Sequence, residues 1–425
     1  MRPILARRLY YYLVFIALCL GSSVLLRRIE LLLLPLPCLG AILLGLWLYS
    51  PSRYTLESSF FPQEVQEGDE VEVHITITAH TPLPLLALTT RLSPSVTVQA
   101  GNPCQVLSLQ AGEREVITYR LCCQRRGRLL LGPLAGQASH FPGLFWQEQV
   151  HALPHPLLIY PRLSFLRRGL LPSHTQVYAG NYVSQSHGEG LEYSNTRSYI
   201  AGDNFRRINW RVSQRWSHIY VNEYARERNA DVIIMIDSLL QVGDQRFNTL
   251  DLSVRGAASL AHYYLQRKDR VGLLDYGGML RWVKPAMGAQ QFYRIMDRLL
   301  DSQVTFSYVS KDITLVPKRI LPPRALVIVF SPLLDQRIFH ALADLAARRF
   351  DVNLIIPSPA LVLNQVFPDT PTNRLASRLW RLRWKQRIAQ LYRLGIGSVE
   401  WDGITPLETV LLALEGVRRQ KRRLG

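Results

Sequence analysis

The sequence is poor in cysteine. Five cysteines occur in 425 residues, and no two of them are spaced as C-x-x-C. A disulfide framework, a thiolate zinc site and thioredoxin-like redox chemistry are therefore not expected. Cys122 and Cys123 are adjacent, and neighbouring positions of a strand point to opposite faces. We expect all five cysteines to be reduced and to pack as small apolar side chains.

Recognisable catalytic motifs are also missing. The chain contains no G-x-x-x-x-G-K-[ST] loop for nucleoside triphosphates, and no H-E-x-x-H, G-x-S-x-G or S-x-x-K motif in a suitable context. Its carboxylates are too scattered to nominate the pair that a glycosidase needs. These absences predict a protein that is not an enzyme, with no catalytic residues and no cofactor.

Acidic residues are scarce relative to basic ones. Lys plus Arg number 50 and Asp plus Glu number 32, which gives a net charge of +18. A chain that is 48% hydrophobic and 19% charged has enough apolar residues to fold around a core. The positive excess favours acidic partners, whether anionic lipid, nucleic acid or an acidic protein face.

The first 50 residues hold two long apolar runs. Tyr10–Leu26 has no charged residue, and Ile29–Tyr49 has only Glu30. Each run is close to the ~20 residues that span a bilayer, so residues 1–50 are predicted to form a transmembrane hairpin. The alternative is a signal peptide cleaved near Gly21, which would be followed by a polar chain rather than by a second apolar run.

Basic residues predict the orientation of this hairpin. Three arginines precede the first run, at positions 2, 7 and 8, and two lie in the loop, at positions 27 and 28. Because basic flanks tend to stay in the cytoplasm, both ends of the hairpin and the chain after it are predicted to be cytoplasmic. The expected location is the inner (cytoplasmic) membrane, crossed twice, with the soluble domains in the cytoplasm.

Residues 51–162 show the period of two that is typical of half-buried strands. Glu70–Thr78 alternates strictly between polar and apolar side chains. Similar short runs follow at Leu85–Arg91, Val96–Val98 and Glu115–Cys122, and Pro and Gly turns separate them. Short strands at this spacing predict a β-sandwich domain.

Residues 230–425 alternate apolar strands with amphipathic helices. Val232–Ile236 is a β-branched run typical of a buried parallel strand, and Asp237 follows it. Arg270–Asp275 and Ala325–Phe330 have the same character, with helical patterns between them. The alternation predicts a doubly wound α/β domain. Ligands of such sheets bind beyond the carboxyl ends of the strands, which makes Asp237 a candidate site residue.

Residues 163–229 join the two domains and form a predicted hinge that is rich in polar and aromatic residues. The run R-S-Y-I-A-G-D-N-F-R-R-I-N-W-R-V-S-Q-R at Arg197–Arg215, followed by Glu223, resembles the signature of the domain of unknown function fifty-eight family. Gln214 departs from the alanine usual at its position. The resemblance implies a membrane-anchored protein with a von Willebrand factor A-like C-terminal domain. It also implies two partners, a MoxR-type AAA+ ATPase and a transglutaminase-like membrane protein.

The charged, aromatic and turn-forming residues of this motif are the candidate interaction or structural site. They are Arg197, Tyr199, Gly202, Asp203, Arg206, Arg207, Asn209, Trp210, Ser213, Arg215 and Glu223. In one interpretation they form an internal clasp, in which arginines pair with carboxylates and stack on aromatic rings to fix the hinge against the α/β domain. In the other they form a docking surface for an acidic partner. No histidine lies in the run to act as a base near neutral pH.

The resemblance also raises the question of a metal site. Von Willebrand A-like domains often bind Mg²⁺ through D-x-S-x-S after the first strand, because hard cations prefer oxygen ligands. Here the five residues from Asp237 read D-S-L-L-Q, so Leu239 offers no oxygen and Gln241 replaces the second hydroxyl. We expect a degraded site in which Asp237 caps a helix or binds loop amides. A Mg²⁺-dependent ligand-binding or catalytic domain is the alternative function.

A basic helix is predicted at about 373–393, with Trp380 and Trp384 on one face. An anionic membrane surface is one predicted partner of this helix, and a solvated helix with the Trp pair in the core is the alternative. Nucleic acid is not expected, because no recognised binding module accompanies the charge.

The predicted function is a membrane-anchored, non-enzymatic protein-interaction module. It would be an adaptor that works with a MoxR-type AAA+ ATPase in the assembly or maturation of other proteins.

Overall fold

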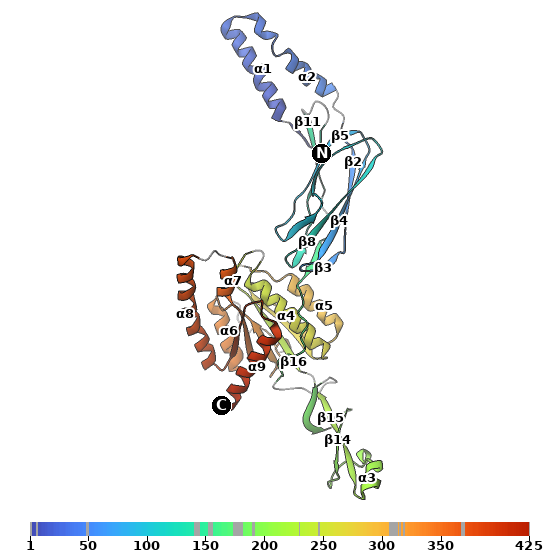
Figure 1. Cartoon of the computed structure of the whole chain (residues 1–425), viewed down its shortest axis with the longest axis vertical. Coiled ribbons are helices and arrows are strands. Elements are labelled where there is room, and N and C mark those ends of the chain that lie inside the picture. Colours follow the sequence, from blue (N-terminus) through green and yellow to red (C-terminus); the bar gives the residue numbers. More distant parts are fainter. Residues whose placement is uncertain are drawn as a thin grey trace. The chain divides into compact units, whose positions relative to one another are not determined.

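The computed structural model describes residues 2–5, 7–47, 51–139, 145–151, 156–172, 182–188, 192–228, 230–244, 247–305, 313, 316–317, 319–366 and 370–424. The chain forms two compact units, Met1–Tyr160 and Pro161–Gly425. The first unit holds two apolar helices and a β-rich region. The second holds a small antiparallel sheet and an α/β domain (Figure 1).

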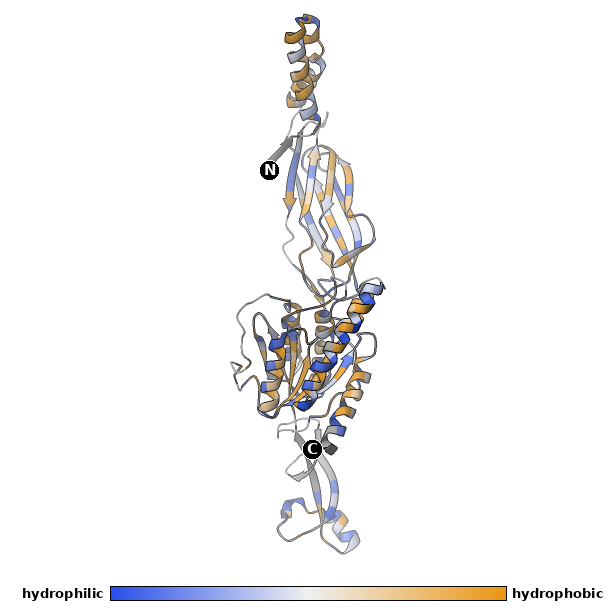
Figure 2. Cartoon of the chain, turned by 90° about the vertical axis from the view of Figure 1, so that its left-hand side faces the viewer, coloured by the Kyte–Doolittle hydropathy of each residue, from blue (hydrophilic) through white to orange (hydrophobic). Residues whose placement is uncertain are grey.

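Two apolar helical stretches open the first unit. The helix α1 covers Arg7–Leu26, and the second stretch forms a 3₁₀ helix, η1 (Ile29–Leu32), followed by α2 (Leu36–Trp47). Arg8–Leu26 and Ile29–Trp47 are each 19 residues long and apolar enough to cross a membrane. Figure 2 shows mostly apolar residues along both stretches. The prediction of two N-terminal apolar helices is thereby confirmed.

The rest of the first unit is built from β-strands. They are β1 (Arg2–Leu5), β2 (Tyr54–Phe61), β3 (Glu64–Gln66), β4 (Glu70–Ala79), β5 (Leu83–Thr90), β6 (Val96–Ala100), β7 (Cys104–Leu109), β8 (Arg114–Cys123), β9 (Gly127–Leu129), β10 (Leu134–Ser139), β11 (Phe145–His151) and β12 (Leu157–Tyr160). A five-stranded sheet has the order β1-β11-β10-β5-β7, a four-stranded sheet β2-β4-β8-β6, and a small sheet β3-β12-β9. Val73 and Ile75 of β4 share one buried core with Leu86 and Leu88 of β5. The β-rich region was therefore predicted correctly.

Both ends of the apolar hairpin are attached to the strand β11. Before α1, the strand β1 pairs antiparallel with β11, and Arg2 lies opposite Glu148. After α2, the backbone N–H of Ser52 donates to Gln147 Oε1 (2.8 Å), and Gln147 Nε2 donates to the Ser52 carbonyl (3.2 Å). Ser52 and Gln147 are both buried. The chain thus leaves the β-rich region and rejoins it at neighbouring residues of one strand.

A six-stranded sheet organises the α/β domain, with the order β18-β17-β16-β19-β20-β21. Its strands are β16 (Asp231–Ser238), β17 (Arg270–Gly277), β18 (Arg281–Ala286), β19 (Leu326–Phe330), β20 (Asp351–Pro357) and β21 (Gly397–Trp401). Neighbours are parallel except for β17 and β18. This confirms the predicted α/β region with a parallel sheet. The strand order reverses beside β16, because the chain continues to β17 on one side and later to β19 on the other.

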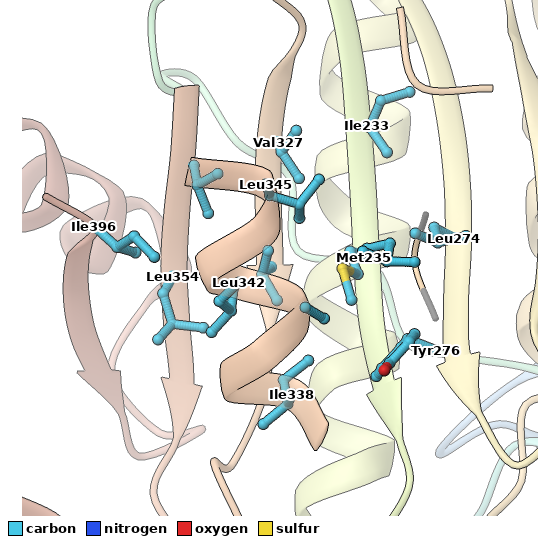
Figure 3. Close-up of a cluster of buried hydrophobic side chains, with 14 of the residues drawn as sticks. Ile233, Met235, Leu274, Tyr276, Val327, Ile338, Leu342, Leu345, Leu354 and Ile396 are labelled. Carbon is cyan, nitrogen blue, oxygen red and sulfur yellow. The ribbon is translucent and has the colours of Figure 1, made fainter. Parts of the chain in front are cut away.

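Helices cover both faces of this sheet. They are α4 (Thr249–Gln266), α5 (Ala289–Leu300), α6 (Gln336–Ala347), α7 (Pro359–Val366), α8 (Pro371–Arg393) and α9 (Leu407–Leu424). Met235 of β16 shares a core with Ile338 and Leu342 of α6 on one face (Figure 3). On the other face α4 passes so close to β19 that a Cβ on Gly256 would overlap the Phe330 ring. All of β16 is buried, which explains its continuous apolar run.

The segment predicted as a hinge contains an antiparallel sheet of its own. The strands β13 (Tyr182–Gly188), β14 (Glu192–Ser198) and β15 (Tyr220–Arg228) pair in the order β13-β15-β14, and we call residues 182–228 the arm. The connection from β14 to β15 holds the 3₁₀ helix η2 (Phe205–Arg207) and the helix α3 (Trp210–Trp216). Figure 1 shows α3 beyond the ends of β14 and β15. Residues 199–219 are called the arm tip below.

Candidate functional site

Most residues of the predicted motif lie in the arm tip. Arg197 is near the end of β14, and nine further motif residues fall within the arm tip. Glu223 lies on β15 opposite Asn195, and its side chain is outside the described residues. Asp237 belongs to a different sheet, at the carboxyl end of β16. The fold therefore gathers the motif into one hairpin connection and keeps Asp237 in a separate site.

An ion pair closes the first turn of the arm tip. Arg197 donates two parallel hydrogen bonds to Asp203, from Nη1 to Oδ2 (2.7 Å) and from Nη2 to Oδ1 (2.8 Å). The backbone N–H of Ile200 donates to the same carboxylate (2.9 Å). The hydrogen bonds from Arg197 and Ile200 lower the pKa of Asp203 to about 2. Gly202 has φ +106° in this turn, a conformation that glycine adopts without strain.

Asn209 and Ser213 fix α3 against β15. Asn209 is the N-cap of α3, where its Oδ1 accepts the N–H of Val212 (3.1 Å), and its Nδ2 donates to Asn222 Oδ1 (2.9 Å). Ser213 Oγ donates to the Asn209 carbonyl (2.8 Å) and accepts from the N–H of Tyr220 (2.9 Å). These bonds satisfy polar groups that a short helix leaves open at its ends. Both residues thus hold the shape of the arm tip.

Large apolar side chains project from this framework into solvent. The exposed fractions are 63% for Ile200, 71% for Phe205, 64% for Trp210, 65% for Trp216 and 45% for Ile219. The Tyr199 ring stacks on Phe205, with centroids 5.9 Å apart. Buried apolar area stabilises a protein by roughly 25 cal/mol per Å², so leaving such side chains in water forgoes that gain. Clustered exposed apolar residues are typical of interaction surfaces.

Arginines are interleaved with these apolar side chains. Arg206, Arg211 and Arg215 are exposed, and none of the three forms an ion pair with a residue that the structure describes. The arm tip contains four arginines and one aspartate, and that aspartate is already paired with Arg197. The surface is therefore positively charged as well as apolar.

The clasp and the docking surface involve different residues of the motif. The clasp was predicted to fix the hinge against the α/β domain, but the bonds described above for Arg197, Asp203, Asn209 and Ser213 all stay within the arm. Trp210 is exposed. Sequence reasoning missed four exposed residues of the surface, which are Ile200, Phe205, Trp216 and Ile219. Their signal was present, because bulky apolar residues occurred in a segment with neither a helical nor a strand period.

A second polar site lies where the strand order of the α/β sheet reverses. Asp237 is 2% exposed at the carboxyl end of β16. Its Oδ2 accepts from Ser331 Oγ, directly after β19 (2.5 Å), and its Oδ1 accepts from the N–H of Leu239 (3.0 Å). Burial raises the pKa of Asp237 to about 7, against the opposing effect of these hydrogen bonds, and the charges of Asp335 and Asp275 add to the rise. The carboxyl is therefore partly protonated near neutral pH.

The groups around Asp237 do not fit a Mg²⁺ cage. Asp335 pairs with the guanidinium of Arg337, with Nη2 and Oδ2 2.7 Å apart, and the hydrogen bond from Arg337 lowers the pKa of Asp335. The Ser238 hydroxyl donates to Asp275 (2.5 Å) instead of lying beside Asp237. Among the described residues, no group of three or more His, Cys, Asp and Glu side chains is gathered as metal ligands. Arg337 pairs directly with Asp335 and interacts with Asp237 only through its charge.

Comparison with known families identifies the central part of the chain. Residues 195–359 match the model of the family described as "Protein of unknown function DUF58". The family predicted from the motif is thereby confirmed over this segment, which includes the arm tip and the sheet as far as β20.

Curated relatives share part of the sequence. Uncharacterized proteins of Mycobacterium bovis and Mycobacterium tuberculosis are 27% identical over 126 residues, which is 29% of this chain and 40% of each relative. The matched region thus spans less than half the length of these relatives.

Solved structures give only weak likenesses. A fragment of Escherichia coli alpha-2-macroglobulin matches 30% of this chain and 20% of its own, at 17% identity and a TM-score of 0.22. The cupredoxin domain of amoB from Nitrosocaldus yellowstonii matches 24% of this chain and 89% of its own, at 11% identity and a TM-score of 0.17. These values are too low to support an argument about fold or function.

Proposed function

We propose that this protein is a membrane-anchored, non-enzymatic interaction module that binds an acidic partner protein through its arm tip. The observation behind the proposal is the set of five exposed apolar side chains among three exposed arginines, Arg206, Arg211 and Arg215, which form no ion pair with a described residue. Tryptophan and arginine are enriched among the residues that dominate binding energy at protein interfaces. The excess of arginine over carboxylate in the arm tip selects a partner face of negative charge.

The hydrogen bonds beneath this surface favour binding. Association costs free energy for each side chain or loop that must become ordered. Here the Arg197–Asp203 pair closes the first turn of the arm tip, and the Asn209 cap fixes the start of α3. We therefore assign the clasp residues to preorganisation and the exposed aromatic and basic residues to contact.

The identity of the partner comes from the family resemblance. A MoxR-type AAA+ ATPase is the first candidate, and a transglutaminase-like membrane protein is the second. The protein would then act as an adaptor in the assembly or maturation of other proteins. The α/β domain would be von Willebrand factor A-like, supported by its parallel sheet and by the aspartate at the carboxyl end of β16, where the strand order reverses.

The apolar hairpin would anchor the module in the inner membrane, with the β-rich and α/β regions in the cytoplasm. The length and composition of Arg8–Leu26 and Ile29–Trp47 support two crossings. The three arginines before the first crossing and the two in the loop support a cytoplasmic location for the flanks.

The helix α8 would lie on anionic lipid. Three leucines spaced along one face are exposed, Leu375 by 59%, Leu379 by 57% and Leu382 by 63%. The helix contains no acidic residue, and Arg378 and Arg381 flank the leucines. On the opposite face of the helix, Trp384 is 9% exposed and packs in the core of the α/β domain. A basic helix with an apolar stripe is typical of peripheral membrane contact.

Hydrogen exchange in α8 should slow in phosphatidylglycerol nanodiscs relative to phosphatidylcholine nanodiscs, and Leu379→Glu should abolish that difference.

The interaction proposal is tested with the full chain in detergent and a purified MoxR-type ATPase. Trp210→Ala should weaken binding by about 30-fold, the effect of losing one dominant interface residue. Tyr293→Ala is the matched control, because Tyr293 is also 64% exposed but lies on α5. Arg211→Glu should slow association and reduce its dependence on salt. Unchanged affinity in both arm-tip variants would exclude this surface. Binding of the transglutaminase-like protein alone, lost in Trp210→Ala, would keep the surface and change the partner.

A further inference from the structure

A cavity with a strongly basic lining lies in the second unit, away from both sites described above. Its volume is about 490 Å³, and its walls come from the segment after Pro161 and from α4 and α9. Tyr263 and Arg267, at the carboxyl end of α4, line it. That end of α4 precedes the first residue of β17, so the cavity lies at the amino edge of the sheet and Asp237 at the carboxyl edge.

The segment that closes the cavity is fixed by bonds to both helices. The N–H of Ser164 donates to Ser259 Oγ on α4 (2.9 Å), and Tyr264 Oη donates to the Leu170 carbonyl (2.8 Å). Arg418 Nη1 of α9 donates to the Leu171 carbonyl (2.9 Å). Leu170 is fully buried. The cavity wall is thus part of the folded domain rather than a loose strand of chain.

Glycine is required at one point of this wall. A Cβ on Gly169 would overlap the Tyr263 ring, so only glycine lets the backbone approach α4 this closely. The close approach places the two preceding residues, Arg167 and Arg168, at the cavity.

Four arginines and one glutamate line the cavity. Arg419 pairs with Glu415 one helical turn before it (2.8 Å), and Arg267 lies over the Tyr263 ring, with its Cζ 5.6 Å from the centroid. Arg167 and Arg168 form no ion pair with any described residue. The carboxyl end of α4 contributes roughly half a negative charge, which offsets only part of one guanidinium. Arg167 and Arg168 therefore leave a net positive charge of about one to two in the cavity.

We propose that this cavity binds a phosphorylated small molecule. Guanidinium groups present paired donors that match phosphate oxygens, and phosphate balances more than one positive charge. The volume lies within the range of about 300–1,000 Å³ typical of small-molecule sites. Leu171 and Leu412 add apolar surface for the remainder of the ligand. The phosphoryl group is the recognised chemistry, and it belongs either to a soluble metabolite or to a lipid headgroup.

Inorganic pyrophosphate is the first probe, titrated calorimetrically into the full chain in dodecyl maltoside. We expect saturable binding of one pyrophosphate per chain. Arg167→Gln with Arg168→Gln should weaken it at least ~10-fold, because each removes a hydrogen bond to a charged group. Arg91→Gln with Arg114→Gln removes the same charge from exposed positions of the β-rich region and should change affinity less than about twofold. An equal loss in both double variants would show that binding follows the overall charge of the chain, which would overturn the proposal.

A blocking variant tests the cavity itself without removing charge. Gly416 of α9 lines the cavity, and a Cβ added there meets no atom within 4 Å. Gly416→Phe should therefore fill the space, keep the melting temperature, and weaken pyrophosphate binding at least ~10-fold. Undiminished affinity in a folded Gly416→Phe chain would place the ligand elsewhere and overturn the proposal.

Two further probes separate the sources of the phosphoryl group. Competition by ATP but not by glycerol 1-phosphate would support a soluble nucleotide-like ligand. Competition by glycerol 1-phosphate alone would support a lipid headgroup. No saturable binding of pyrophosphate, ATP or glycerol 1-phosphate at millimolar concentration would overturn the proposal.

Discussion

Asp203 in the arm tip and Asp237 in the α/β sheet both accept hydrogen bonds, yet their pKa values move in opposite directions. The hydrogen bonds from Arg197 lower the pKa of Asp203 to about 2, whereas burial raises that of Asp237 to about 7. The Arg197 and Asp203 side chains remain 35% and 20% exposed. Asp237 is 2% exposed and meets a hydroxyl and an amide instead of a full positive charge.

The opposite pKa shifts of Asp203 and Asp237 reflect a partly exposed environment in the arm tip and a buried one in the α/β sheet. In the arm tip, Asp203 is paired with Arg197 in a partly exposed position, and bulky apolar side chains remain in solvent around the pair. At the carboxyl edge of the sheet, Asp237 and its polar neighbours form hydrogen bonds with one another inside the fold. A carboxylate at the carboxyl end of a strand is therefore not by itself evidence of a ligand, because the surrounding groups decide whether it can bind one.

The largest expected contrast is in stability. Trp384 is buried on α8 and stacks on Trp380, with centroids 5.9 Å apart, whereas Trp210 is exposed on α3. Trp384→Ala should cost about 3–5 kcal/mol of unfolding free energy. Trp210→Ala should stay within about 0.5 kcal/mol. Denaturant unfolding of the full chain in detergent measures both, and equal losses would remove the distinction between the two regions.

The pH dependence of stability should follow the raised pKa of Asp237. Its folded pKa of about 7 exceeds the unfolded value of about 4, so the folded state binds the proton more tightly. The stabilisation is complete below about pH 4 and is lost as the pH rises to about 7. Asp237→Asn cannot ionise and should lose this slope in melting temperature. A variant with the same slope as the parent would assign the pH dependence to other groups.

A moderate and local effect is expected at the cap of α3. Asn209→Ala removes the acceptor for the Val212 amide, which should cost about 1 kcal/mol and speed hydrogen exchange there. Asn209→Asp keeps the acceptor but cannot donate to Asn222. It should retain protection of Val212, and loss of protection in both variants would mean that the bond to Asn222, and not the cap, holds α3.

The smallest effect concerns Asp203. Its folded pKa of about 2 lies below the unfolded value of about 4, so its stabilisation is present above pH 4 and is lost as the pH falls to about 2. The pair is partly exposed, so the loss should be confined to the arm tip. The protection factor of the Ile200 amide, which donates to Asp203, should fall in this range. Asp203→Asn should already show low protection at pH 7.

The sequence predicted the elements whose signals are local and strong. Val232–Ile236 is buried on both faces, so its apolar run indicated β16 and placed Asp237 at its end. The strand β18 was missed, because it lies at the sheet edge and reads R-W-V-K-P-A, with polar and apolar residues mixed. The arm strands were missed for a similar reason, since their sequences are mostly polar.

The candidate site was only partly accessible from sequence. Motif spacing located the arm tip, but it could not assign Asn209 to a helix cap or Trp210 to solvent. Those outcomes depend on which residues across the hairpin, such as Asn222 and Tyr220, come within hydrogen-bonding distance. Likewise, the sequence places Ser331 directly after a later apolar strand, but its hydrogen bond to Asp237, 94 residues earlier, depends on β16 and β19 pairing side by side.

The attachment of both hairpin ends to β11 has a consequence for the number of times the hairpin could cross a bilayer. In the membrane-anchored arrangement proposed above, a loop whose two ends are held by the same strand would cross the bilayer an even number of times. Its two flanks would then lie on one side, regardless of how many arginines each contains. The strand pairing at Arg2 and Glu148 and the hydrogen bonds between Ser52 and Gln147 therefore hold the two ends of the hairpin together. Because these contacts already hold the ends of the loop together, pairing of the two helices in lipid would cost little additional loop-closure entropy. A force on the β-rich region would be shared by two chain segments instead of one.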